Sequence, residues 1–193
     1  MERNELVLAR LSKQYLLRTG ERMEVLRAMN GLQAQFLSNA LHAMRLRSTA
    51  YDAAHAADGL VKGWTLRGTM HIFAEADLPL FLHTGCRYRS RDWTVPSFWN
   101  QRPDWALTPQ RQAYFSDLIV DALAQGPMTR EALKARCRAA GMTQAEEGSI
   151  FHPWGGGIRE LCERGFLCGT VSEEKAFRLL SLIHISEPTR RVV

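Results

Sequence analysis

The sequence predicts a mainly α-helical protein with small β-hairpins, built from two similar helix-rich domains in tandem. Apolar residues recur at helical spacing in several segments, and pairs of short strand-like runs follow the helices in each half. The chain has 193 residues and 46% apolar content, which is ordinary for a globular protein. We place the two domains at residues 1–83 and 108–179, with a linker at 84–107.

The first domain begins with two expected helices, the second of which ends at Asn30-Gly31. Further along, Gly68 lies between two strand-like runs and indicates a tight hairpin. The expected elements are, in order, a helix around Leu8–Tyr15, a helix around Val25–Met29, a short helix over Tyr51–Gly59, strands at Trp64–Arg67 and Thr69–Phe73, and a helix over Ala74–His83.

The second domain shows clearer boundaries. Thr108-Pro109 offers a capping hydroxyl and a proline at the first helical position, and helical spacing continues to Leu123. Thr129 is expected to cap a second helix, which ends at Gly141. A polar connection should then lead through Gly155-Gly156-Gly157, which permits close approach to a neighbouring element or a DNA phosphate, into a third short helix.

Two strand candidates, Phe166–Cys168 and Ala176–Leu179, follow that third helix and predict a hairpin. Helices followed by a hairpin are the order of a winged helix, a helix-turn-helix variant, so we predict tandem winged-helix domains. In such a domain the third helix approaches a DNA groove and the hairpin touches the backbone. The DNA-contacting residues predicted here are Arg159, Arg164 and Lys175.

The linker alternates arginines with aromatic residues. One interpretation is a platform where bases stack while Arg87, Arg89 and Arg91 neutralise phosphates. The alternative, which we favour, is a linker whose tryptophans anchor it against both domains. The net charge of +5, with 21 arginines against 4 lysines, suits a polyanion but also fits a codon bias towards arginine.

Several classes of protein are disfavoured by the composition. The sequence has no apolar run near the ~20 residues that a membrane span needs, and its charged N-terminus does not resemble a secretory signal. We therefore expect a cytoplasmic protein with no membrane partner. The four cysteines and six histidines lack metal-ligand spacing, so we expect no metal or cofactor and mostly buried, unpaired cysteines.

The C-terminal residues 180–193 are expected to be an artefactual tail. From Leu180 to Arg190 they match, residue for residue, the translation of a transposon-end adapter used in sequencing libraries. Sequence of this origin is best excluded from fold reasoning. We therefore expect the native sequence to diverge near Leu179, and the shortened chain to bind DNA weakly or to be inactive.

Two segments carry a family resemblance. Asn30–Gln35 and Trp64–His71 resemble the winged-helix DNA glycosylases of the AlkZ type, and the resemblance extends over nearly all of residues 1–179. It implies excision of bulky N7-alkylated purines, including crosslinked ones, from double-stranded DNA by a monofunctional glycosylase. It also implies that Gln33 and Gln35, separated by the apolar Ala34, are the catalytic pair.

The chemistry of a carboxamide is consistent with this role. An amide is a poor base, yet it can orient a water molecule by accepting one hydrogen bond and donating another. Orientation suffices when the leaving group is already cationic, as an N7-alkylated guanine is. Without the resemblance, the simpler interpretation of Gln33 and Gln35 is a capping segment whose amides bond to backbone. The corresponding alternative function is a non-catalytic winged-helix regulator.

Other polar residues near this segment receive mainly structural interpretations. Arg67 could hold a phosphate or orient a glutamine, whereas His71 on an apolar strand is expected to be a satisfied structural histidine. Glu75 and Asp77 are expected near a helix N-terminus, where the helix dipole favours negative charge.

Overall fold

The computed structural model describes residues 3–17, 19–65, 68–82, 89–172 and 176–180. The first half of the chain holds four helices and three strands: α1 (Arg3–Lys13), α2 (Arg22–Ala28), β1 (Leu32–Gln33), α3 (Leu37–Arg47), β2 (Leu60–Trp64), β3 (Met70–Ala74), a 3₁₀ turn (Glu75–Asp77) and α4 (Leu78–Phe81). The second half holds α5 (Pro109–Leu123), β4 (Met128–Thr129), α6 (Arg130–Ala139), α7 (Gln144–Ile150), α8 (Gly156–Glu163), β5 (Leu167–Gly169) and β6 (Ala176–Leu179).

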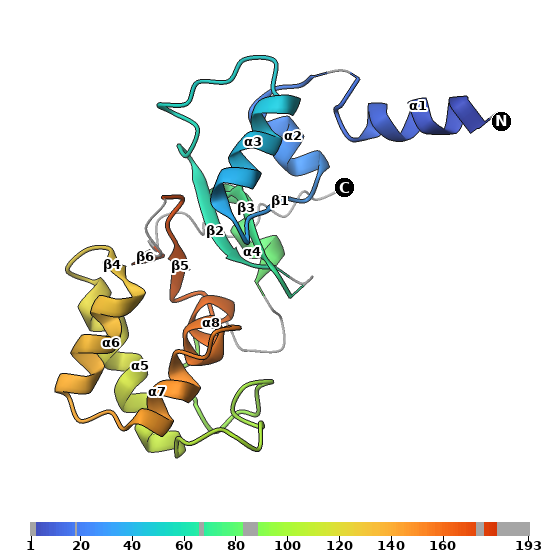
Figure 1. Cartoon of the computed structure of the whole chain (residues 1–193). Coiled ribbons are helices and arrows are strands. Elements are labelled where there is room, and N and C mark those ends of the chain that lie inside the picture. The colour runs from blue at the N-terminus through green and yellow to red at the C-terminus, as the bar shows by residue number, and fades with distance from the viewer. Residues whose placement is uncertain (1–2, 18, 66–67, 83–88, 173–175, 181–193) are drawn as a thin grey trace, which may run out of the picture.

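All six strands form one antiparallel sheet in the order β1-β3-β2-β5-β6-β4. Each half contributes three strands, in which the last strand lies between the first and the second. The halves meet where β2 pairs with β5, at Lys62 and Gly169 (Figure 1). A Cβ atom at Gly169 would lie 2.9 Å from the Lys62 carbonyl oxygen, so this close approach requires glycine.

Three apolar clusters hold the sheet and helices together. One cluster lies under α2 and α3 in the first half, and a larger one lies among α5, α6, α7 and α8 in the second. A third joins the halves, with Val61 and Phe73 from the first packed against Cys168 and Leu180 from the second. The ion pair between Glu75 and Arg178, 2.8 Å long, connects the halves as well.

The predicted starts of α5 and α6 are confirmed. The Thr108 hydroxyl accepts a hydrogen bond from the Arg111 backbone N–H, and Thr129 caps α6 through the Ala132 N–H. The segment between α6 and α8, which we expected to be a polar connection, contains the helix α7. Its start is a reciprocal capping box, in which Thr143 and Glu146 each bond to the other's backbone N–H.

The triple glycine allows α8 to begin directly against the end of α7. Gly156 has a φ of +60°, and a Cβ atom there would lie 2.2 Å from the Ser149 carbonyl oxygen. A Cβ atom at Gly157 would meet the Ile150 side chain at 2.8 Å. Of the two interpretations of this motif, close approach to a neighbouring element is the one that the packing supports.

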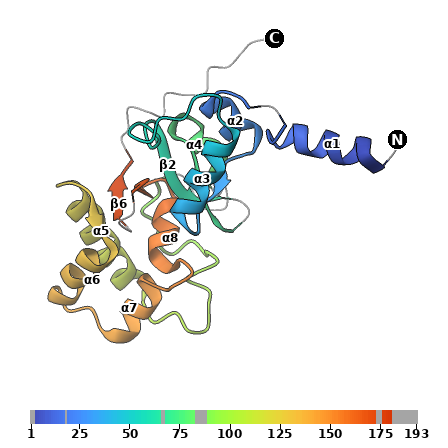
Figure 2. The ribbon, with the colours of Figure 1, turned by 45° about the horizontal axis from the view of Figure 1, so that its top comes forward.

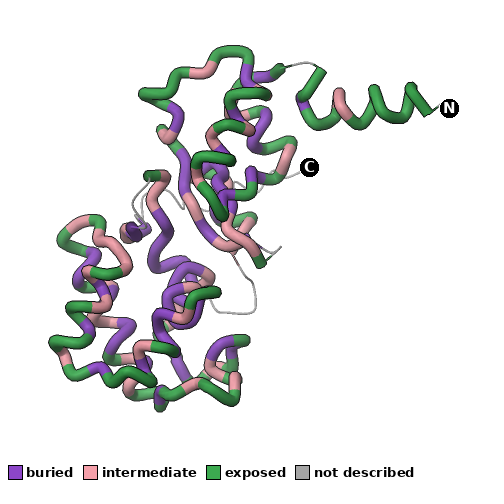
Figure 3. The backbone as a smooth tube through the Cα atoms, in the orientation of Figure 1, coloured by how far each residue is buried: buried purple, intermediate pink, exposed green. Residues whose placement is uncertain are grey.

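Several expectations for the first half need correction. The segment Tyr51–Gly59 forms turns rather than a helix. The helix expected around Leu8–Tyr15 is present as α1, but it buries no residue and projects away from the rest of the chain (Figures 1, 2 and 3). The hairpin around Gly68 is present, but its first strand covers Leu60–Trp64 and not the expected Trp64–Arg67. The helix expected over Ala74–His83 is reduced to a 3₁₀ turn and α4.

The residues of the expected linker that the structure describes, 89–107, wrap around the second half. Trp93 is buried in the core of that half and Trp105 packs against it. Anchoring by tryptophans is therefore seen, although these contacts are to the second half rather than to both. None of the helices in the described part of the chain is long and apolar enough to cross a membrane.

The described cysteines fit the expectation of buried, unpaired thiols. Cys137, Cys162 and Cys168 are all buried and free. Burial raises the pKa of Cys137 to about 12 and that of Cys168 to about 11, which keeps these two thiols protonated at neutral pH. Cys86 lies outside the described residues.

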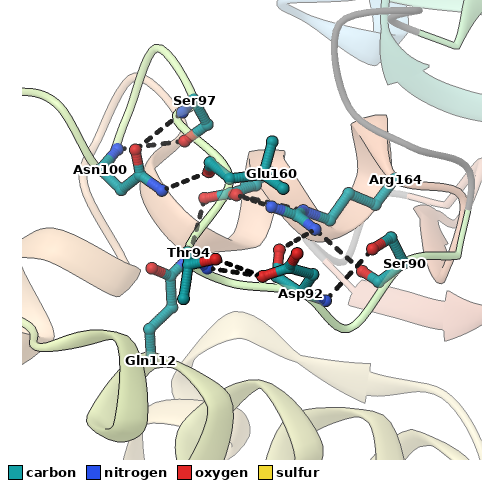
Figure 4. A network of polar contacts seen from close by, with 9 residues as sticks. Ser90, Asp92, Thr94, Ser97, Asn100, Gln112, Glu160 and Arg164 are labelled. Carbon is teal, nitrogen blue, oxygen red and sulfur yellow. Dashed lines mark hydrogen bonds and ion pairs between the residues drawn. The ribbon is translucent and has the colours of Figure 1, made fainter.

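Arg164, predicted to contact DNA, is instead fully buried, and this corrects the prediction. Its guanidinium group pairs with Glu160 at 2.7 Å and donates hydrogen bonds to the carbonyl oxygens of Ser90 and Asp92 (Figure 4). Gln112 donates to the other Glu160 carboxylate oxygen, at 2.9 Å. Burial raises the pKa of Glu160, and the hydrogen bonds from Arg164 and Gln112 oppose that shift. Arg164 therefore ties residues 90–92 to α8.

Leu180, the first residue of the expected tail, packs against the fold. Its side chain is buried, its N–H donates to the Phe166 carbonyl oxygen, and its carbonyl oxygen accepts a hydrogen bond from Arg89. The chain therefore continues its ordered packing one residue beyond β6. Residues 181–193, which include the apolar part of the expected tail, lie outside the described residues.

Replacing Arg164 alone should destabilise the fold far more than replacing both members of its ion pair. Arg164→Met leaves the Glu160 carboxylate buried without its cation, and we expect a loss of about 3–5 kcal/mol in the free energy of unfolding. Arg164→Met/Glu160→Leu should recover much of that loss. Urea denaturation followed by circular dichroism measures both, with Arg91→Ala as an exposed control that should cost under about 1 kcal/mol. Equal losses in the single and double variants would contradict this account.

Stability should also depend on the ionisation of Glu146. The Arg111 guanidinium, 2.6 Å away, lowers the pKa of Glu146 to about 2 from its ordinary 4.5. Because the folded chain binds this proton less readily than the unfolded chain, the contribution is present above pH 4.5 and is lost as the pH falls towards 2. The stability difference between the wild type and Glu146→Gln should therefore shrink over that range in urea titrations. A difference independent of pH would show that the carboxylate charge contributes nothing.

Candidate active site

Gln33 and Gln35 lie on the same face of an extended segment. Leu32 and Ala34 are buried, whereas Gln33 and Gln35 are exposed, which is the alternation expected of a strand. The strand β1 pairs with β3 through Leu32–Ile72 and Gln33–His71, and the Ala34 N–H donates to the Met70 carbonyl oxygen at 2.8 Å. The single apolar residue between the glutamines therefore places both amides on the solvent side.

Neither amide acts as a helix cap. Phe36 occupies the position before α3 and provides no side-chain cap, and neither glutamine side chain makes a hydrogen bond to any residue that the structure describes. The alternative interpretation of a capping segment required such bonds. Both amides keep their donors and acceptors available for a water molecule or a ligand.

Gln35 lines a cleft between the two halves of the chain. The larger hollow of this cleft has a volume of about 820 Å³, and the smaller has about 290 Å³. They share Gln35, Trp64, Met70 and Pro153 as lining residues and are therefore neighbouring parts of one cleft. Gln33 lies on the same face as Gln35 but lines neither hollow.

Basic and aromatic side chains dominate the walls of the cleft. Among the described lining residues, Glu131 is the only acid, and it pairs with Lys134 at 2.9 Å. Asp104 and Glu163 stand outside the cleft lining and hold two of its arginines in place. The basic lining residues are Lys62, Arg102, Arg130, Lys134 and Arg159, and the aromatic ones are Trp64, Phe98, Trp99, Phe151, Trp154 and Phe177, with His152 beside them.

The predicted DNA-contacting residues are not all brought together. Arg159 lines the smaller hollow and donates across it to the Gly68 carbonyl oxygen at 3.4 Å, which links α8 to the β2–β3 hairpin. Arg89 bonds to Leu180, and the exposed Arg91 pairs with Asp117, so neither lines the cleft. The remaining three predicted residues, Arg67, Arg87 and Lys175, lie outside the described residues.

His71, Glu75 and Asp77 have structural partners. His71 is buried, and its Nδ1 lies 3.0 Å from the Thr69 carbonyl oxygen and 3.2 Å from the Thr65 hydroxyl. Glu75 and Asp77 form ion pairs with Arg178 and Arg27, which give these carboxylates a more specific role than helix-dipole charges. In the described part of the chain, no cluster of His, Cys, Asp or Glu could hold a metal ion.

Most of the cleft wall could not be predicted from the sequence. Trp154, Lys62, Arg130 and Lys134 stand out in no motif of the sequence. These residues gather only because β2 pairs with β5, a contact between positions 107 residues apart in sequence (62 and 169). The one local signal was the alternation around Ala34, which indicates that the two glutamines face the same way.

A family model described as DNA glycosylase AlkZ-like matches residues 26–158. This match covers more than half of the sequence and includes Gln33, Gln35 and most of the cleft wall. The chain therefore belongs to the AlkZ-like family of DNA glycosylases.

Two relatives accompany the family match. A protein from Streptomyces sahachiroi named "Interstrand DNA cross-link repair glycosylase" is 29% identical over 154 residues, covering 75% of this chain and 39% of that protein. The solved structure of Streptomyces sahachiroi DNA glycosylase AlkZ matches with a TM-score of 0.64 at 24% identity, over 88% of this chain and 47% of that one. The likeness shows a shared fold, and this chain spans less than half the length of either relative.

Proposed function

We propose that this chain forms part of a monofunctional DNA glycosylase that hydrolyses the bond between deoxyribose and a bulky N7-alkylated purine in double-stranded DNA. The observation that carries the proposal is the pair of exposed amides of Gln33 and Gln35, which make no hydrogen bond to the described residues and of which Gln35 lines a basic and aromatic cleft. Membership of the AlkZ-like family and a curated relative named as a crosslink-repair glycosylase support it.

We further propose that each half of the chain is a winged helix. In both halves a helix, a short strand, further helical or turn structure and a hairpin follow one another, and the three strands pair in the same order. This is the order expected of a helix-turn-helix variant with a wing. Two such units joined edge to edge would present a continuous surface to a DNA duplex.

The mechanism follows from the charge of the leaving group. An N7-alkylated purine is cationic, so when its bond to C1′ breaks, the electron pair moves to the purine nitrogen and neutralises the ring. A water oxygen, oriented by the two amides, bonds to C1′ and releases its proton to solvent. Amide side chains do not ionise near neutral pH. The two glutamines therefore contribute positioning and hydrogen-bond dipoles and do not act as a base. An unmodified purine, which leaves as an anion, would not be released.

The basic wall of the cleft would hold the DNA backbone. Each phosphate contact with an Arg or Lys releases a condensed counterion, and binding should therefore weaken steeply as salt rises. The cleft is open and broad enough for a bulky adduct, which would not enter the snug pocket of enzymes that flip single bases.

Replacing both glutamines should abolish base release while leaving DNA binding intact. Gln33→Ala/Gln35→Ala is expected to slow release of the alkylated base by at least about 100-fold, in line with the loss of oriented transition-state contacts. Release is measured by mass spectrometry on a duplex with one N7-alkylguanine, with protein in excess so that weak binding does not hide the chemistry. Fluorescence anisotropy measures DNA affinity.

Gln110→Ala/Gln144→Ala is the matched control because both glutamines are exposed and line neither hollow. This variant should release base at the wild-type rate. No release by the wild-type chain at saturation, or wild-type release by the Gln33/Gln35 double variant, would refute the proposal. Sequence-selective binding without base release would instead identify a regulator.

A further inference from the structure

Two large aromatic side chains at the smaller hollow are strongly exposed. Trp154 is 71% exposed and Phe98 is 72% exposed, and both line this hollow together with Gln35. Exposed apolar side chains are common singly, but grouped ones on a concave surface mark a binding site more often. The DNA contacts proposed above use basic groups and leave these two rings without a role.

The turn that presents Trp154 is fixed by several contacts. The His152 carbonyl oxygen accepts hydrogen bonds from the Arg130 guanidinium at 2.7 Å and from the Gly155 N–H at 2.9 Å. The backbone N–H of Trp154 donates to the Nδ1 atom of the His152 ring at 3.2 Å. Gly155 has a φ of +145°, and a Cβ atom there would lie 2.9 Å from the Trp99 ring. The turn is therefore held in one conformation while its indole stays exposed.

The segment that carries Phe98 is fixed in a similar way. Ser97 and Asn100 exchange two side-chain-to-backbone hydrogen bonds, at 2.7 and 3.1 Å, which close the turn around Phe98 (Figure 4 shows Ser97 and Asn100). Phe98 lies edge-on to the buried Trp99, with ring centroids 5.2 Å apart. Both turns are thus held in defined conformations, which lowers the entropy lost when a ligand stacks on the rings that they carry.

Two guanidinium groups line the same hollow. Arg102 and Arg159 each lie over the Trp99 ring at 5.7 Å and also line the hollow. The hollow therefore combines π-surfaces with cations, which suits a planar aromatic group carried on a polyanion. Neither a purely apolar ligand nor a free phosphate would use both features.

We propose that Trp154 and Phe98 form a subsite that binds a planar aromatic group by stacking, next to Gln35. The proposal rests on the function proposed above, since it places that group on damaged DNA. The planar group is either the polycyclic part of the lesion or an unstacked nucleobase, and both offer the same π-face. Stacking would hold the damaged nucleotide beside Gln35 without any hydrogen bond that reads sequence.

The test compares affinities for DNA with and without a polycyclic adduct. The probes are a duplex with one N7-(naphthylmethyl)guanine, one with N7-methylguanine, and an unmodified duplex containing a single-stranded gap. The modified nucleotides carry 2′-fluorine, which slows loss of the base, and affinity is measured by fluorescence anisotropy. We expect Trp154→Ala to weaken binding of the naphthyl duplex about tenfold, and Trp154→Phe to restore most of it.

The pattern across the probes distinguishes the two sources of the planar group. A loss confined to the naphthyl duplex identifies the lesion as the stacked group, whereas a similar loss for all three probes identifies a nucleobase. Tyr114→Ala is the matched control, because Tyr114 is a half-exposed aromatic residue on α5 that lines neither hollow. Unchanged affinity of Trp154→Ala for every probe would overturn the subsite.

Failure of this proposal and failure of the proposed function give different results. All affinities are also measured in the Gln33→Ala/Gln35→Ala background, where no turnover is expected. A Trp154 effect that persists there supports the subsite whatever the chemistry of the glutamines. If Trp154→Ala changes no affinity while the glutamine variant still loses base release, the subsite is wrong and the glycosylase proposal stands.

Discussion

The antiparallel pairing of Lys62 with Gly169 merges two three-stranded sheets into one, and the cleft exists because of it. The walls of the cleft come from β2 and β3 on one side and from α6, the α7–α8 turn, β5 and β6 on the other. Only glycine at position 169 allows the two backbones to approach this closely. The apolar cluster around Phe73 and Cys168 and the Glu75–Arg178 ion pair stabilise the same junction.

A second constraint fixes the far wall of the cleft. The buried Arg164–Glu160 pair ties residues 90–92 to α8, and this helps to place the following segment, which carries Phe98, beside the smaller hollow. A buried ion pair is not in itself a source of stability, because desolvation offsets much of its attraction. The pair instead positions residues 90–92. Arg164 can satisfy its hydrogen-bond donors only when the carbonyl groups of Ser90 and Asp92 lie beside it.

Local sequence signals predicted the local parts of this structure. The Thr108 and Thr129 caps and the Gly68 hairpin follow from hydrogen bonding and backbone sterics within a few residues, and they were predicted correctly. The capping box of α7 was an equally local signal, but it was overlooked. The joining of the two sheets and the exposure of Trp154 depend on contacts distant in sequence and could not be predicted. Arg164 shows the same limit, since an arginine on a predicted recognition helix gives no sign that it is buried.

The candidate site likewise combines features that depend on local sequence with features that depend on contacts distant in sequence. The strand β1 was not predicted, although the alternation of apolar and polar residues around Ala34 is a local signal for it. The two glutamines were singled out by the resemblance to a family, which gave them a role that their chemistry permits. Nothing in the sequence indicated that Gln35 would border a cleft whose opposite wall lies more than ninety residues away, at Thr129 and beyond.

The central claim is that neutral amides suffice because the departing base already carries positive charge. The pH dependence of single-turnover base release from N7-alkylguanine DNA tests it most directly, because glutamine does not ionise and a carboxylate or histidine does. The account predicts a rate that is level between about pH 5 and pH 9. A rate that rises or falls tenfold per pH unit within that range would reveal an ionising base or acid and would contradict the account.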